Sequence, residues 1–156
     1  MTEQIGDIFI RRGKRYEGNR YNSLYFPLDC VDTFKIKTRP WSSNCWRGYV
    51  AEYDISNNEM ILKNLDISGL KPFPKINNSK PKYIKNTIFS RTKSVRYENI
   101  NMKIPFTGEI YLNRELTGPI NKLMFNARQA ECNIILEFVN GNLINEIYNL
   151  NPYLSK

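Results

Sequence analysis

The chain has 156 residues, of which 41% are hydrophobic and 24% charged, values typical of one folded domain spanning residues 1–156 rather than of a disordered chain. It contains no histidine, which excludes Ser-His-Asp and Cys-His catalytic pairs and every histidine-containing metal site. Lys and Arg number 23 against 15 Asp and Glu, so the formal net charge is +8.

The cysteines Cys30, Cys45 and Cys132 are odd in number and show no Cys-x-x-Cys spacing. They fall short of the usual four ligands of a structural zinc site, and a disulfide framework would leave one thiol over. We therefore expect reduced thiols, no metal and no cofactor. The first residues lack the pattern of a secretory signal, and no apolar run approaches the ~20 residues of a spanning helix. We expect a cytoplasmic protein that does not enter a membrane.

The predicted elements are mostly strands. Residues 7–11 and 14–17 predict a pair joined through Gly13, and residues 21–28 predict a further strand. Residues 46–55 and 60–67 predict a hairpin around an Asn57-Asn58 turn. Its register would place opposite one another the pairs Ile55 and Met60, Tyr53 and Leu62, and Glu52 and Lys63.

Residues 71–103 form a different kind of segment. They carry nine Lys and Arg and one acid, Glu98, so their net charge of +8 equals that of the whole chain. Their first half contains three prolines and the Asn77-Asn78-Ser79 cluster, which predict a loop or extended insert, and residues 87–100 predict a strand.

The last third of the chain predicts three elements. Residues 108–113 indicate a strand, and residues 120–130 a short helix or an irregular excursion after Gly118-Pro119. Residues 133–139 and 142–147 flank Asn140-Gly141, the pair best suited to a type I′ turn. In that hairpin we expect three facing pairs, Phe138 with Leu143, Leu136 with Asn145, and Ile134 with Ile147.

These patterns together predict a mainly β fold, an antiparallel sandwich or partly closed barrel with one or two short helices. The sequence shows none of the common catalytic constellations, because it contains no glycine-rich phosphate loop and its acids are scattered. We therefore expect a binding protein rather than an enzyme.

Two segments supply candidate binding residues. In the basic stretch, lysines and arginines interleave with aromatic residues, as in surfaces that bind single-stranded nucleic acid or an acidic protein; a solvated cationic loop is the plainer interpretation. In residues 40–50, two Trp and an Arg favour a recognition surface or, alternatively, an aromatic plug of the core. The candidates are Lys75, Lys80, Lys82, Tyr83, Lys85, Arg91, Lys93 and Arg96, with Trp41 and Arg47.

The run Cys45-Trp46-Arg47-Gly48-Tyr49-Val50-Ala51, a strand ending in Asp54-Ile55, and Met60-Ile61-Leu62-Lys63-Asn64-Leu65 resemble a group of small, poorly characterised bacterial β-rich proteins with a W-R-G-Y-x-A signature. Residues 106–112 and 134–146 look similar to the second half of that group. The resemblance covers most of the chain except the basic stretch, and it carries over no catalytic residue.

The resemblance implies a product of a variable bacterial locus, where small domains encoded beside toxin genes often serve as immunity proteins. We expect a protein that occludes a toxin, or another protein partner with an acidic surface, through residues 71–103. An RNA- or DNA-binding accessory protein that uses the same stretch is the alternative, and a phage- or plasmid-encoded inhibitor of a host defence protein is a second one.

Overall fold

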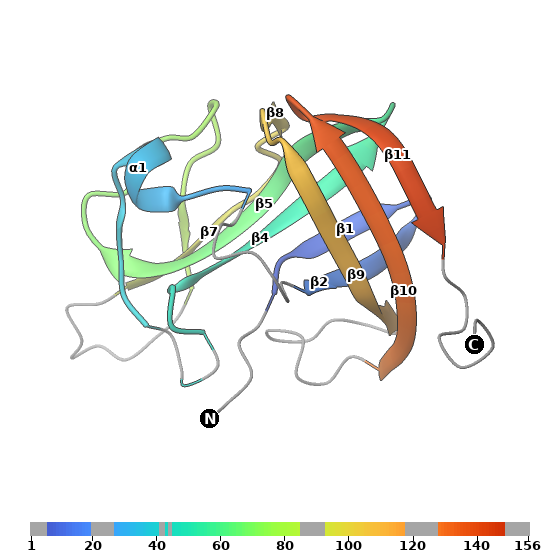
Figure 1. Ribbon diagram of the computed structural model, residues 1–156. Helices are drawn as coiled ribbons and strands as arrows, with labels where there is room; N and C mark the ends of the chain where they lie inside the picture. Colours follow the sequence, from blue (N-terminus) through green and yellow to red (C-terminus); the bar gives the residue numbers. More distant parts are fainter. Residues whose placement is uncertain are drawn as a thin grey trace. The chain divides into compact units, whose positions relative to one another are not determined.

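A computed structural model describes residues 6–19, 27–40, 43, 45–84, 93–117 and 128–148 of the chain (Figure 1). These residues group into two compact units, each treated by itself: the first holds described residues within 27–52 and 62–102, and the second those within 6–19, 53–61 and 103–148. The elements are β1 Ile8–Arg11, β2 Lys14–Asn19, α1 Cys30–Phe34, β3 Lys37–Thr38, β4 Tyr49–Ser56, β5 Glu59–Leu70, β6 Lys82–Tyr83, β7 Lys93–Tyr97, β8 Met102–Lys103, β9 Gly108–Thr117, β10 Arg128–Val139 and β11 Asn142–Tyr148.

The fold is mainly antiparallel β, as the sequence predicts, and its sheet closes into a barrel. The strand order β11-β10-β9-β2-β1-β4-β5 returns to β11 through the Asn142–Glu59 pairing in the second unit, which gives a closed barrel of seven strands. Closure removes most exposed sheet edges. The remaining strands add to β5 and β7, and α1 is the single helix within the described residues.

The core of the second unit lies among side chains that alternate inward along its strands. The Phe9 ring stacks on Tyr53 with centroids 5.1 Å apart, and Leu112, Leu136 and Phe138 are buried beside strands of the same unit. The predicted strand pair at residues 7–11 and 14–17 is confirmed as β1 and β2.

The β10–β11 hairpin confirms the predicted turn but not the whole register. Asn140 and Gly141 have φ angles of 50° and 79°, as a type I′ turn requires, and Phe138 pairs with Leu143. A bulge follows, in which Ile144 is the extra residue. Beyond it Leu136 pairs with Glu146 rather than Asn145, and Ile134 with Tyr148 rather than Ile147.

The bulge turns the side chains of β11 over, because a shift of one residue moves each side chain to the other face of a strand. Glu146 lies 13% exposed and accepts a hydrogen bond from Arg11 at 2.8 Å, whereas Ile144 and Ile147 are 57% and 47% exposed. The prediction that one face of this hairpin is apolar is therefore wrong for the second half of β11.

The β4–β5 hairpin has the predicted turn. Asn57 and Asn58 adopt φ angles of 53° and 57°, and the expected apolar cluster of Ile55, Met60, Tyr53 and Leu62 is buried. Beyond Leu62 the alternation of β5 changes phase, since Lys63 and Asn64 are both half-buried and Leu65 is the next residue inside. Glu52 and Lys63 take different partners: Asn64 donates to Glu52, and Lys63 donates to Asn101.

In the first unit, β7 pairs with β5 and β6 pairs with β7. The buried side chains are those of Ile36, Ile67, Val95, Tyr97 and Ile100. Helix α1 begins after Asp29, whose carboxylate accepts the backbone N–H of Asp32 at 3.2 Å, as an N-cap residue does. The strand predicted at residues 87–100 is present as β7, while residues 85–92 lie outside the described part of the chain.

Three other predicted boundaries differ. The strand predicted from Trp46 begins at Tyr49, because the chain turns at residues 46–48. The predicted strand 21–28 lies outside the described residues up to position 26, and Leu28 is in no strand. Of the predicted helix 120–130, residues 128–130 belong to β10 and the rest lies outside the described residues.

Candidate functional site

The first half of the basic stretch, residues 71–84, is here called the basic loop. Asn77 and Asn78 have φ angles of 46° and 69°, and Ile76 and Ser79 exchange two backbone hydrogen bonds across them. This is a two-residue turn of the kind that asparagine favours, because asparagine tolerates the left-handed conformation. Ile76 is 2% exposed, so the turn is anchored by a buried side chain.

Three further hydrogen bonds tie the basic loop to residues 97–100. The Asn77 amide donates to the carbonyl of Ile100, the Ser79 hydroxyl donates to the carbonyl of Glu98, and the Tyr97 hydroxyl donates to the carbonyl of Pro74, each at 2.7 Å. Burial, with Tyr83 and Cys30 nearby, raises the pKa of Tyr97 to about 12, so the hydroxyl keeps its proton at neutral pH. The basic loop is therefore an ordered part of the first unit.

The outer surface of the basic loop is cationic and aromatic. Lys71, Lys75, Lys80 and Lys82 are exposed, and Tyr83 is 55% exposed. The Tyr83 ring meets Phe73 edge to face at 6.1 Å between centroids, and the Lys71 ammonium lies 5.4 Å from the ring centroid. These contacts hold the Tyr83 ring in place by aromatic and cation–π attraction while leaving half of it open to solvent.

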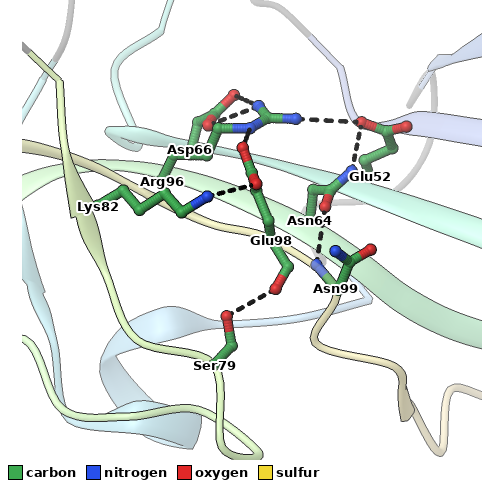
Figure 2. A network of polar contacts seen from close by, with 8 residues as sticks. All are labelled: Glu52, Asn64, Asp66, Ser79, Lys82, Arg96, Glu98 and Asn99. Carbon is green, nitrogen blue, oxygen red and sulfur yellow. Dashed lines mark hydrogen bonds and ion pairs between the residues drawn. The ribbon is translucent and has the colours of Figure 1, made fainter.

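Arg96, predicted as a binding residue, is the centre of a polar network on β7 (Figure 2). One Nη of its guanidinium donates to both oxygens of Asp66 at 2.8 and 2.9 Å, its Nε lies 3.4 Å from Glu98, and its other Nη lies 4.0 Å from Glu52. The change of phase in β5 places Asn64 and Asp66 on the face that Glu52 occupies, so carboxylates distant in sequence meet one guanidinium.

The charges in this network compensate one another. Burial raises the pKa of Asp66. The charge and hydrogen bond of Arg96 lower it, but by less than burial raises it, so the pKa stays above its ordinary value. Burial also acts to lower the pKa of Arg96, but the carboxylates of Asp66, Glu52 and Glu98 outweigh it and raise that pKa. Arg96 therefore serves the structure of this unit, since its guanidinium is held by hydrogen bonds to Asp66 and by the nearby carboxylates of Glu98 and Glu52.

Lys82 belongs partly to the same network. Its ammonium lies 2.9 Å from Glu98, and this hydrogen bond and its charge lower the pKa of Glu98. The Lys82 side chain is still 69% exposed. The cations of the basic loop that point outward without an ion pair in the described structure are thus Lys71, Lys75 and Lys80.

The remaining candidates are distributed differently. Lys93 is half-buried on β7. Lys85, Arg91 and Trp41 lie outside the described residues. Lys71 was not among the predicted residues; its position over Tyr83 depends on the fold of the loop, and only its exposed charge could have indicated it.

The Trp46–Tyr49 corner combines the two interpretations of residues 40–50. Trp46 is 66% exposed, whereas Tyr49 is buried and donates a 2.7 Å hydrogen bond to the carbonyl of Leu28. Arg47 is half-buried, with its guanidinium carbon 4.5 Å from the centroid of the Tyr49 ring. Gly48 makes this corner possible, since its φ is 77° and a Cβ there would collide with the carbonyl oxygen of Arg39.

Within the described residues, no group of three or more Cys, Asp and Glu side chains could hold a metal ion. Cys30 and Cys45 are buried thiols that form no disulfide among the described residues, and the structure does not describe the side chain of Cys132. None of the described helices is long and apolar enough to span a membrane.

Comparisons of the chain with protein-family models, with curated proteins and with solved structures find no significant match.

Proposed function

We propose that this protein is a non-catalytic binding protein that docks on an acidic surface of a protein partner, in the manner of an immunity protein that occludes a toxin. The single observation that carries the proposal is the ordered basic loop. Its lysines and Tyr83 are exposed, while its backbone is tied down at Pro74, Asn77 and Ser79. A binding surface that is already rigid loses little conformational entropy when a partner docks.

The composition of this surface also supports the proposal. Tyrosine is common at the centres of protein interfaces, and flanking lysines steer an acidic partner and fix its orientation. Because Arg96 is paired with Asp66, the outward charge comes from Lys71, Lys75 and Lys80, and in part from Lys82, which contacts Glu98 but is 69% exposed. The interface would therefore depend on a few cations beside one aromatic anchor.

Co-expression with the product of the adjacent gene tests the proposal. We expect a one-to-one complex in size-exclusion chromatography and, where that product is toxic, restored growth. Lys80→Glu should weaken the complex at least tenfold in a titration, because it puts like charge against the acidic surface. Arg15→Glu, at an exposed cation on β2, reverses the same charge outside the basic loop and should leave the affinity within twofold. Equal losses from both variants, or no complex, would count against the proposal.

Binding of single-stranded nucleic acid is the second candidate, because the exposed Tyr83 ring beside lysines also suits base stacking. That function predicts affinity for a twenty-nucleotide poly-dT probe that falls with salt by a log–log slope of about −0.7 per phosphate contact. The ammonium of Lys71 against the ring takes up stacking surface, which favours the protein partner. An absence of poly-dT binding at low salt would eliminate this candidate.

A further inference from the structure

Among the described residues, the basic loop contains a sheet edge with no strand on its outer side. In the strand order of the described sheet β6 is the last strand, paired on one side with β7. Ile84 donates its backbone N–H to Ser94 at 2.9 Å, and Tyr83 lies opposite Val95. Bonded and non-bonded pairs alternate in antiparallel sheets, so the N–H and C=O of Tyr83 point away from β7, as does the C=O of Pro81.

The side chains along this edge permit one class of partner and oppose another. Lys80 and Lys82 flank it, and Pro81 lacks an N–H. Lysine and proline on an edge are the devices by which proteins prevent their own strands from pairing. A second copy of this chain would bring like charges together, whereas an acidic strand would not.

The two faces of the edge differ. Lys82 projects to one face, where its ammonium lies 2.9 Å from Glu98, and Tyr83 projects to the other, where it contacts Phe73. Lys80 is exposed two residues before Lys82. A strand added beside β6 would place every second side chain near the two ammonium groups and the others near the exposed part of the Tyr83 ring. The matching sequence alternates acidic and apolar residues.

We propose that the partner binds by adding an extended strand of alternating acidic and apolar residues to the free edge of β6. This inference rests on the proposed function and specifies its binding mode. The partner residue opposite Tyr83 would exchange two backbone hydrogen bonds with it, and a neighbouring N–H would donate to the carbonyl of Pro81. Main-chain bonds would provide affinity, and the lysines would provide selectivity for acidic strands.

A capped ten-residue peptide of alternating glutamate and valine serves as the probe, measured by titration against the full chain. Its comparator carries N-methyl groups on the valine nitrogens, which removes the donors of the edge that would face Tyr83 and keeps the charge. We expect the unmodified peptide to bind at least tenfold more tightly than the methylated one. Lys80→Glu should weaken binding of the unmodified peptide.

Two variants of the protein test the contribution of Tyr83 to the same edge. Tyr83→Pro removes the free N–H without breaking the β6–β7 ladder, since that N–H faces away from β7, and Tyr83→Ala removes only the ring. With melting temperatures of the two variants matched, Tyr83→Pro should bind the unmodified peptide more weakly than Tyr83→Ala.

The outcomes separate this inference from the proposed function. Equal binding of both peptides, weakened equally by Lys80→Glu, would overturn strand addition and leave electrostatic docking intact. Failure of both peptides to bind would also overturn strand addition, while the complex with the adjacent gene product would still decide the proposed function. Binding of poly-dT with a steep salt dependence, and of neither peptide, would overturn both.

Discussion

Replacing Arg96 with methionine removes the guanidinium that Asp66, Glu52 and Glu98 share and keeps an unbranched apolar stem. Loss of one partner from a fully buried ion pair costs ~3–5 kcal/mol, and exposed pairs contribute ~1 kcal/mol or less. The side chains of Arg96 and Asp66 are 34% and 20% exposed, between these limits. We therefore expect Arg96→Met to lower the free energy of unfolding by about 1–3 kcal/mol at pH 7.

Urea denaturation followed by tyrosine and tryptophan fluorescence measures this loss, with Lys93→Met on the same strand as the control. Burial already raises the pKa of Asp66, and removing Arg96 should raise it further. A carboxyl whose folded pKa is raised gains stability as pH falls through that pKa, so the cost of Arg96→Met should shrink between pH 7 and pH 4. A loss no larger than that of Lys93→Met, or one independent of pH, would refute the assignment of Arg96 to structure.

Other expected outcomes concern Tyr97 and Gly48. Tyr97→Phe should cost about 1–2 kcal/mol because the carbonyl of Pro74 loses its donor, and a loss below 0.5 kcal/mol in urea denaturation would contradict this. Since the pKa of Tyr97 is raised to about 12 against 10 in the unfolded chain, wild-type stability should fall as pH rises from 10 to 12, and less so in Tyr97→Phe. Gly48→Ala should cost about 2 kcal/mol or more, because it adds a Cβ against the carbonyl of Arg39 at positive φ; an unchanged thermal midpoint would show that the corner relaxes.

Local signals account for the parts of the fold that could be predicted. Asn140-Gly141 and Asn57-Asn58 determine their turns because these residues accept positive φ, and the alternation beside them identifies the strands. The bulge at Ile144 could not be predicted in this way. The observed register leaves Ile144 and Ile147 exposed and places Glu146 against Arg11, a contact between residues 135 positions apart that local alternation does not indicate.

The candidate site shows the same division. The exposure of Lys75 and Lys80 follows from their charge, and the sequence indicates a loop from its prolines and asparagines. The sequence could not predict that the Arg96 side chain contacts Glu52 and Asp66. These two acids lie outside residues 71–103, so a charge count within that stretch does not include them. Nor could it indicate that hydrogen bonds from Ser79 and Tyr97 would order the loop.

The most direct test of the binding surface is residue-resolved amide hydrogen exchange at Tyr83 and Ile84, with and without the alternating glutamate–valine peptide. In the free protein Ile84 should exchange slowly because it donates to Ser94, and Tyr83 should exchange fast. With saturating peptide, we expect exchange at Tyr83 to slow at least tenfold. Unchanged exchange at Tyr83, while the peptide is bound, would contradict recognition through the edge of β6.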